Sequence, residues 1–184
     1  FSRVESGARS DRWYVVVPGR IEENLEQLAA RLTPGACLAL AWHIAAALAE
    51  VHEHGGAHGA LHPQHIGLDT RGNLTIRPAL AASLRIDPDP DATAQASDCF
   101  QFVSILDTLD VSEAGDPALE LLMNGLSRDR SRLRMQPGRA IRQTLTAILQ
   151  RHPAWTDRLV EELGPAWKPG TLPRAPAQDR PAAP

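Results

Sequence analysis

The run "AAALAEVHEHGGAHGALHPQHIGLDTRGNLTIRPAL", Ala45 to Leu80, joins the end of an apolar helical pattern to a histidine-rich loop and a β-hairpin pattern. The helical pattern begins near Ala36 and is apolar nearly all round, which is typical of a buried helix. Gly55-Gly56 predicts its end. After the loop, "HIGLD" and "NLTIR" flank "TRG", which predicts a hairpin over residues 65–77. A buried helix therefore leads through a short loop into a small β element.

The rest of the chain supplies mostly helical patterns. "RWYVVVP", residues 12–18, predicts a strand, with residues 1–6 as its hairpin partner. Residues 85–97 are acidic and punctuated by proline, which predicts a loop. Apolar residues at helical spacing predict further helices over residues 22–32, 97–110, 116–126, 136–152 and 153–164.

Composition excludes several classes of protein. The chain has 184 residues, 43% of them hydrophobic and 22% charged, which favours one globular domain. A formal net charge of −3 gives no basic stripe for nucleic acid. No apolar run reaches the length of a membrane span, so we expect a cytoplasmic protein. Two cysteines, Cys37 and Cys99, lie in apolar patterns and are expected to be buried thiols.

Residues 45–80 resemble the centre of the protein-kinase C-lobe, where a buried helix leads into a His-Arg-Asp loop, a metal-binding Asn and a hairpin ending in Asp-Phe-Gly. In this register the first motif is His-Gly-Ala, a histidine replaces the Asn, and Pro-Ala-Leu replaces the last motif. These degenerate positions are His58, Gly59, Ala60, His65, Pro78, Ala79 and Leu80.

The resemblance implies a fold class and a division of the chain. We expect a mostly α (α+β) fold with the helical core of a bacterial Ser/Thr-kinase-type C-lobe over residues 19–163. Residues 1–18 would be a residual N-lobe hairpin and hinge, so most of the N-lobe is absent. Residues 164–184, rich in proline, would be a disordered tail.

The departures from the family motifs predict a protein that is not an enzyme. A methyl group at Ala60 cannot accept the proton of a substrate hydroxyl. His65 and Pro78 replace the oxygen ligands that Mg²⁺ requires. We therefore expect a pseudokinase without cofactor, without ATP–Mg²⁺ binding, and with a role in protein binding. A scaffold or an allosteric or inhibitory regulator of a signalling partner fits that role.

Two residues are expected to be structural and three to form an interface. In the resemblance, Asp98 accepts backbone N–H bonds from the loop, and His58 packs beneath the loop and bonds backbone. A plain helix N-terminal charge is the other interpretation of Asp98. Trp13, Tyr14 and Val15 belong to an apolar strand whose free edges would favour self-association or an obligate partner.

Two alternatives come from the same residues. The histidine-rich 52–65 segment places His54, His58 and His62 four residues apart, and three imidazoles could hold zinc. The glycines and Pro63 argue against one continuous helix there, which makes the metal site the weaker interpretation. An atypical nucleotide-binding protein, with a site near residues 17–21, is the other alternative.

Overall fold

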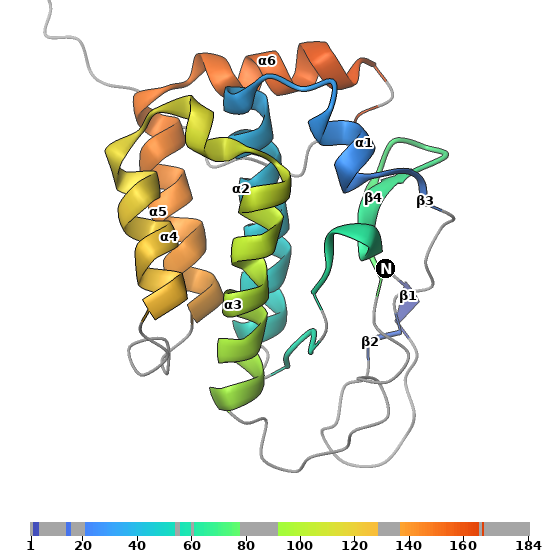
Figure 1. Ribbon diagram of the computed structural model, residues 1–184. Helices are drawn as coiled ribbons and strands as arrows, with labels where there is room; N and C mark the ends of the chain where they lie inside the picture. Colours follow the sequence, from blue (N-terminus) through green and yellow to red (C-terminus); the bar gives the residue numbers. More distant parts are fainter. Residues whose placement is uncertain are drawn as a thin grey trace, which may run out of the picture.

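The computed structural model describes residues 2–3, 14–15, 21–53, 56–59, 61–77, 92–128, 137–165 and 167 (Figure 1). These residues form a mostly helical fold with small antiparallel sheets. The α-helices are α1 (Leu25–Ala29), α2 (Pro34–Glu53), α3 (Ala92–Thr108), α4 (Pro117–Arg128), α5 (Pro137–Arg151) and α6 (Ala154–Leu163). The strands are β1 (Ser2–Arg3), β2 (Tyr14–Val15), β3 (Ile21–Asn24), β4 (Ile66–Asp69) and β5 (Leu74–Ile76), and two short 3-10 helices are η1 (Pro63–His65) and η3 (Val111–Ala114).

Helix α2 is the centre of the core, as its sequence predicts. Most of its residues are buried, and α3, α5 and α6 pack around it (Figure 1). Its N-terminus is held by α6, because Glu162 accepts hydrogen bonds from the Thr33 backbone N–H at 2.8 Å and the Thr33 hydroxyl at 3.3 Å. Gly35 lies so close to Trp155 of α6 that a β-carbon there would collide with the indole.

The sequence analysis expected no segment long enough to cross a membrane. This expectation is wrong when a helix is judged only by its length and composition. Helix α2, at 20 residues, passes that test, and it is the one helix in the described residues that does. About 72% of its most apolar window is buried against other parts of the fold. This burial is what the core helix of a globular domain requires, so the helix is weak support for a membrane span.

The predicted hairpin over residues 65–77 is confirmed. Strands β4 and β5 pair antiparallel, with Ile66 opposite Ile76, and β3 adds to the other side of β4 to give the order β3-β4-β5. Gly72 closes the turn with φ of 77°, a left-handed conformation that favours glycine. The sheet lies beside α1, away from the helices α4 and α5 (Figure 1).

Asp69 shapes the hairpin turn. Its carboxylate accepts the backbone N–H of Arg71 at 2.8 Å and of Asn73 at 2.9 Å, and the Asn73 side-chain amide donates to both oxygens. These bonds, led by those from Asn73, lower the pKa of Asp69 to about 2. The carboxylate therefore stabilises the turn and has little capacity left for a ligand.

A second hairpin pairs the N-terminal strands. Ser2 lies opposite Val15 and Arg3 opposite Tyr14 in the antiparallel pair of β1 and β2. The pairing of residues 1–6 with the "RWYVVVP" strand is thus confirmed for these positions. Trp13 lies outside the described residues.

The predicted helix over residues 22–32 is wrong at its start. Residues 21–24 form strand β3, and α1 begins only at Leu25. The cause is a capping box: the Asn24 side chain accepts the Gln27 backbone N–H, and the Gln27 side chain accepts the Asn24 backbone N–H, each at 2.9 Å. This reciprocal pair fixes the helix N-terminus and leaves the preceding residues free to pair with β4.

The start of α3 also differs from its prediction. The helix begins at Ala92, although residues 85–97 were predicted as a loop and the helix was predicted over residues 97–110. Residues 92–97 carry Gln95, whose side chain packs toward the end of α2 and bonds its backbone. Asp98 therefore lies well inside the helix, and its interpretation as a helix N-terminal charge is wrong.

The start of α4 follows its sequence signals. Asp116 accepts the Ala118 backbone N–H at 2.8 Å, with Pro117 as the first helical residue. Both oxygens of the same buried carboxylate also accept hydrogen bonds from Arg151, and His152 lies 3.2 Å away. Burial would raise the pKa of Asp116, but the bonds from Arg151, Ala118 and His152 lower it.

The ordered domain extends past the predicted boundary at residue 164. Trp167 is 5% exposed and belongs to the hydrophobic core, where its ring meets His43 of α2 edge to face at 5.3 Å. The assignment of residues 164–184 to a disordered tail is therefore wrong at its start. A large aromatic ring gains too much from burial to remain in solvent when a slot on α2 can take it.

Candidate functional site

The loop after α2 is held by one face of α3. Gln95, Asp98 and Gln101 lie three residues apart, so their side chains project from the same side of the helix. Gln95 donates to the backbone oxygens of His52 and Gly56, at 3.3 and 2.9 Å. The Gln101 side-chain oxygen accepts the Leu61 N–H at 2.6 Å. Three side chains from one helix thus fix the backbone between α2 and η1.

Asp98 is the central residue of this arrangement. It is fully buried, and its carboxylate accepts the backbone N–H groups of His58 at 2.6 Å and Gly59 at 2.7 Å. These are the backbone bonds that the resemblance implies for Asp98. A third bond comes from His52 Nε2, 3.0 Å from Oδ2. A buried carboxylate needs such donors, since an unpaired buried charge is costly.

His52 completes the buried network. Its Nδ1 accepts the Gly138 backbone N–H of α5 at 3.2 Å, which leaves Nε2 as the donor to Asp98. Both side chains have no exposed surface. The two bonds connect α2 to α3 and to α5, so the loop is anchored to three helices at once.

His58 also bonds backbone, as expected. Its Nε2 lies 2.8 Å from the carbonyl oxygen of Arg77, at the end of the hairpin. Burial lowers its pKa, against the opposing effects of the Arg77 carbonyl and of the Asp98 charge. The other ring nitrogen is buried without a hydrogen-bond partner. The neutral histidine therefore links the loop to the hairpin. A second proton, on the buried Nδ1, would have no hydrogen-bond acceptor and would be poorly solvated.

His62 and His65 bracket the short helix η1. His62 Nδ1 accepts the Gln64 N–H at 3.2 Å, which makes it the cap of that helix, and the two imidazole rings lie 5.8 Å apart. In the part of the chain that the structure describes, no three His, Cys, Asp or Glu side chains come together as a metal site. His54 lies outside those residues. The zinc alternative gains no support from His58 and His62.

Several predicted site residues lie outside the described part of the chain. These are Ala60, Pro78, Ala79, Leu80 and Trp13. Gly59 is described, with φ of 79°, and is exposed at the outer side of the loop. Tyr14 and Val15 are described only as part of β2.

Gln95 and Gln101 were missed by the sequence analysis. The signal that could have found them is their spacing: both lie three residues from Asp98, on the side of α3 that faces the loop. Recognising it required the correct start of α3, because residue 95 had been assigned to a loop.

Comparisons with protein-family models, with curated proteins and with solved structures gave no match to this chain. The resemblance to protein kinases therefore rests on the sequence motifs of this chain alone.

Proposed function

We propose that the chain is a catalytically inactive, kinase-like domain that works in the cytoplasm by binding another protein, as a scaffold or as an allosteric or inhibitory regulator. The supporting observation is the loop itself. Seven hydrogen bonds hold the described residues of this segment, His52, Gly56, His58, Gly59 and Leu61, against α3 and α5. A rigid loop without catalytic groups is suited to recognition.

The chemistry of the loop supports inactivity. A phosphoryl-transfer site needs a carboxylate near the substrate hydroxyl and oxygen ligands for Mg²⁺. Position 60 is alanine, and residue 65 is a histidine in the register of the resemblance. The carboxylate that holds the loop, Asp98, is fully buried and accepts hydrogen bonds from backbone N–H groups. It cannot take over the role of the missing base.

The first arm of the test is nucleotide binding. Thermal unfolding is measured with and without millimolar ATP and Mg²⁺, and phosphate transfer is assayed on the same sample. We expect neither a shift of the midpoint nor transfer. A ligand at 100 times its Kd would stabilise the fold by about 2.7 kcal/mol, which is easily seen. A clear rise with ATP–Mg²⁺ would contradict the proposal and favour the nucleotide-binding alternative.

The second arm is association through the N-terminal hairpin. A two-stranded hairpin is marginally stable alone, and its open edges favour pairing with another chain. We expect light scattering to show concentration-dependent association, and a Trp13→Ala, Val15→Asp variant to lose it. A wild-type chain that stays monomeric at high concentration would remove the hairpin as the interface and leave an obligate partner to bind elsewhere.

A further inference from the structure

The indole of Trp167 is held on α2 by packing alone. It is buried and meets the imidazole of His43 edge to face at 5.3 Å, and His43 meets Trp42 of the same helix edge to face at 5.1 Å. Nε1 of Trp167 and Nε2 of His43 are both buried, and neither has a hydrogen-bond partner among the described residues. A buried polar group without a partner costs free energy, which makes this aromatic contact weaker than its buried area suggests.

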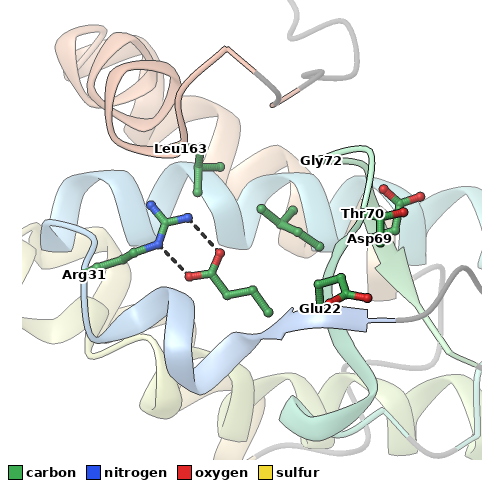
Figure 2. Close-up of a pocket in the computed structure, with 8 residues that line it drawn as sticks. Glu22, Arg31, Asp69, Thr70, Gly72 and Leu163 are labelled. Carbon is green, nitrogen blue, oxygen red and sulfur yellow. Dashed lines mark hydrogen bonds and ion pairs between the residues drawn. The ribbon is translucent and has the colours of Figure 1, made fainter.

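The segment that carries Trp167 starts from a fixed point, the end of α6. Arg31 donates to the backbone oxygen of Glu162 at 2.7 Å, and Figure 2 shows the Arg31 side chain near Leu163, the last residue of α6. Gly164 follows with φ of 77°, a left-handed conformation that favours glycine and ends the helix. The chain therefore leaves α6 at Gly164, and a movement of Trp167 need not disturb the helix.

No charged side chain in the described part of the protein compensates a proton on His43. Burial lowers the pKa of His43 to about 4, and burial is its only cause. Helix α2 packs against α3, η3, α5 and α6, and the titratable groups on and beside these elements leave the pKa of His43 unshifted. These groups are Cys37, Glu50, His52 and Glu53 of α2, Asp98, Cys99 and Asp107 of α3, Asp110 and Glu113 at η3, Arg139, Arg142 and Arg151 of α5, His152, and Asp157, Arg158, Glu161 and Glu162 of α6.

Of the two indoles that flank His43, that of Trp167 is the easier to move. A protonated imidazole donates from both ring nitrogens, and the buried Nε2–H would have no acceptor in the described residues. Water can reach that proton only if one of the indoles leaves. Moving Trp42 would break its hydrogen bond to the Thr146 hydroxyl at 2.7 Å, whereas moving Trp167 breaks no side-chain hydrogen bond.

We propose that Trp167 is an acid-released strap: when His43 takes up a proton, the indole leaves α2 and uncovers His43, while the rest of the helical core stays folded. The inference does not depend on the proposed protein-binding function. The pKa of His43 is about 4 beneath the indole and would return to its ordinary value of 6.5 in water, so the released state gains as the pH falls below 6.5. Between pH 7 and pH 5 the ratio of released to bound strap should rise about twentyfold.

The test measures hydrogen exchange of the indole N–H of Trp167 by NMR, relative to free tryptophan at the same pH. The resulting protection factor falls in proportion to the population of the released state. Trp42 is the internal reference, because its indole N–H is bonded to Thr146 in the core and should exchange only on deeper unfolding. His43→Leu removes the titrating group, and His152→Leu is the matched control, since the His152 ring stacks on Trp155 instead.

We expect the protection of Trp167 to be lower than that of Trp42, to be insensitive to low concentrations of urea, and to fall about twentyfold from pH 7 to pH 5. Insensitivity to urea identifies a local opening, because such an opening exposes little surface. His43→Leu should show the same protection at both pH values, and His152→Leu should keep the twentyfold change.

Equal protection and equal urea dependence of Trp167 and Trp42 would mean that the indole is released only by global unfolding, which would overturn the proposal. This comparison uses the wild-type chain and needs no variant to fold. Protection of Trp167 that is unchanged or higher at pH 5 would also overturn it. A twentyfold fall that persists in His43→Leu would rule out His43 as the trigger.

Discussion

Helix α2 buries two histidines, nine residues apart, in opposite ways. At its C-terminal end, His52 has both ring nitrogens in hydrogen bonds, one to Asp98 and one from Gly138. Nearer its N-terminal end, His43 lies edge to face between the indoles of Trp42 and Trp167, at 5.1 and 5.3 Å, and its buried Nε2 has no partner. Histidine thus belongs to a hydrogen-bond network at position 52, whereas at position 43 it packs as an apolar side chain would.

The difference shows which buried polar groups help to select a single folded arrangement. A buried polar atom without a partner costs free energy, whereas a satisfied network fixes a unique arrangement. The His52 region pins a loop and two helices, so its removal should be costly. The His43 region gains mainly from ring packing, so its polar atom is dispensable at neutral pH and harmful in acid.

The largest expected effect comes from Asp98→Ala. The substitution leaves the N–H groups of His58 and Gly59 and the Nε2 of His52 without an acceptor in the interior. Breaking a buried charged network by removing one member costs about 3–5 kcal/mol. We expect a fall of that size in the free energy of unfolding, measured by urea denaturation.

Asp107→Ala is the matched control, because Asp107 is an exposed aspartate on the same helix. It should change stability by less than about 0.5 kcal/mol. The loss of stability in Asp98→Asn should fall between these two values. The amide oxygen can accept some of the hydrogen bonds, but the NH₂ group is a donor and would face groups that are themselves donors. If Asp98→Ala and Asp107→Ala had equal effects, Asp98 would not be the anchor of the loop.

The next effect concerns pH and His43. Burial lowers the pKa of His43 from 6.5 to about 4, so the unfolded chain takes up a proton at a higher pH than the folded chain. Stability is therefore complete above pH 6.5 and falls as the pH drops toward 4. Between pH 7 and pH 5 this residue should account for a loss of about 2 kcal/mol, at 1.36 kcal/mol per pKa unit.

His43→Leu should remove that part of the acid sensitivity while staying within about 1 kcal/mol of the wild type at pH 7, because it deletes an unpaired polar atom. Trp167→Phe keeps a ring against position 43 and should retain the full pH dependence. Unfolding curves at pH 5 and pH 7 give both results. An unchanged difference between the two pH values in His43→Leu would show that His43 is not the group that titrates.

The contrast between the two regions also explains what the sequence could predict. The apolar periodicity of α2 predicted a buried helix, and the turn residues "TRG" predicted the β4–β5 hairpin, because both signals are local. The N-terminus of α1 was missed, since Asn24 and Gln27 form a capping box inside a run that also has helical spacing. Trp167 was missed because its partner, His43, is far away in the sequence.

The candidate site was predicted in part. The backbone bonds of Asp98 and His58 were expected from the resemblance, and the structure contains them. The bond from Gly138 to His52 joins residues 86 positions apart, and no local pattern indicates it. The bulge at Glu22 exists only once β3 has paired with β4, so no local pattern indicates it either.

The smallest expected effect tests the contact between α5 and the His52 region. A β-carbon at Gly138 would lie 2.8 Å from His52 Nδ1 and 3.0 Å from the Cα of Ala49, closer than packed atoms allow. Gly138→Ala must therefore push α5 away from α2 and lengthen the bond from its N–H to His52. Overpacking of this kind costs about 1–3 kcal/mol, offset by about 1 kcal/mol because alanine favours a helix more than glycine does. We expect a net loss of about 1 kcal/mol in the free energy of unfolding, measured by urea denaturation.

Gly125→Ala, in α4 with no atom within 4 Å of the new β-carbon, is the matched control and should be neutral or stabilising. A Gly138→Ala variant as stable as Gly125→Ala would mean that α5 does not approach His52 this closely, and that the network around Asp98 is not coupled to α5.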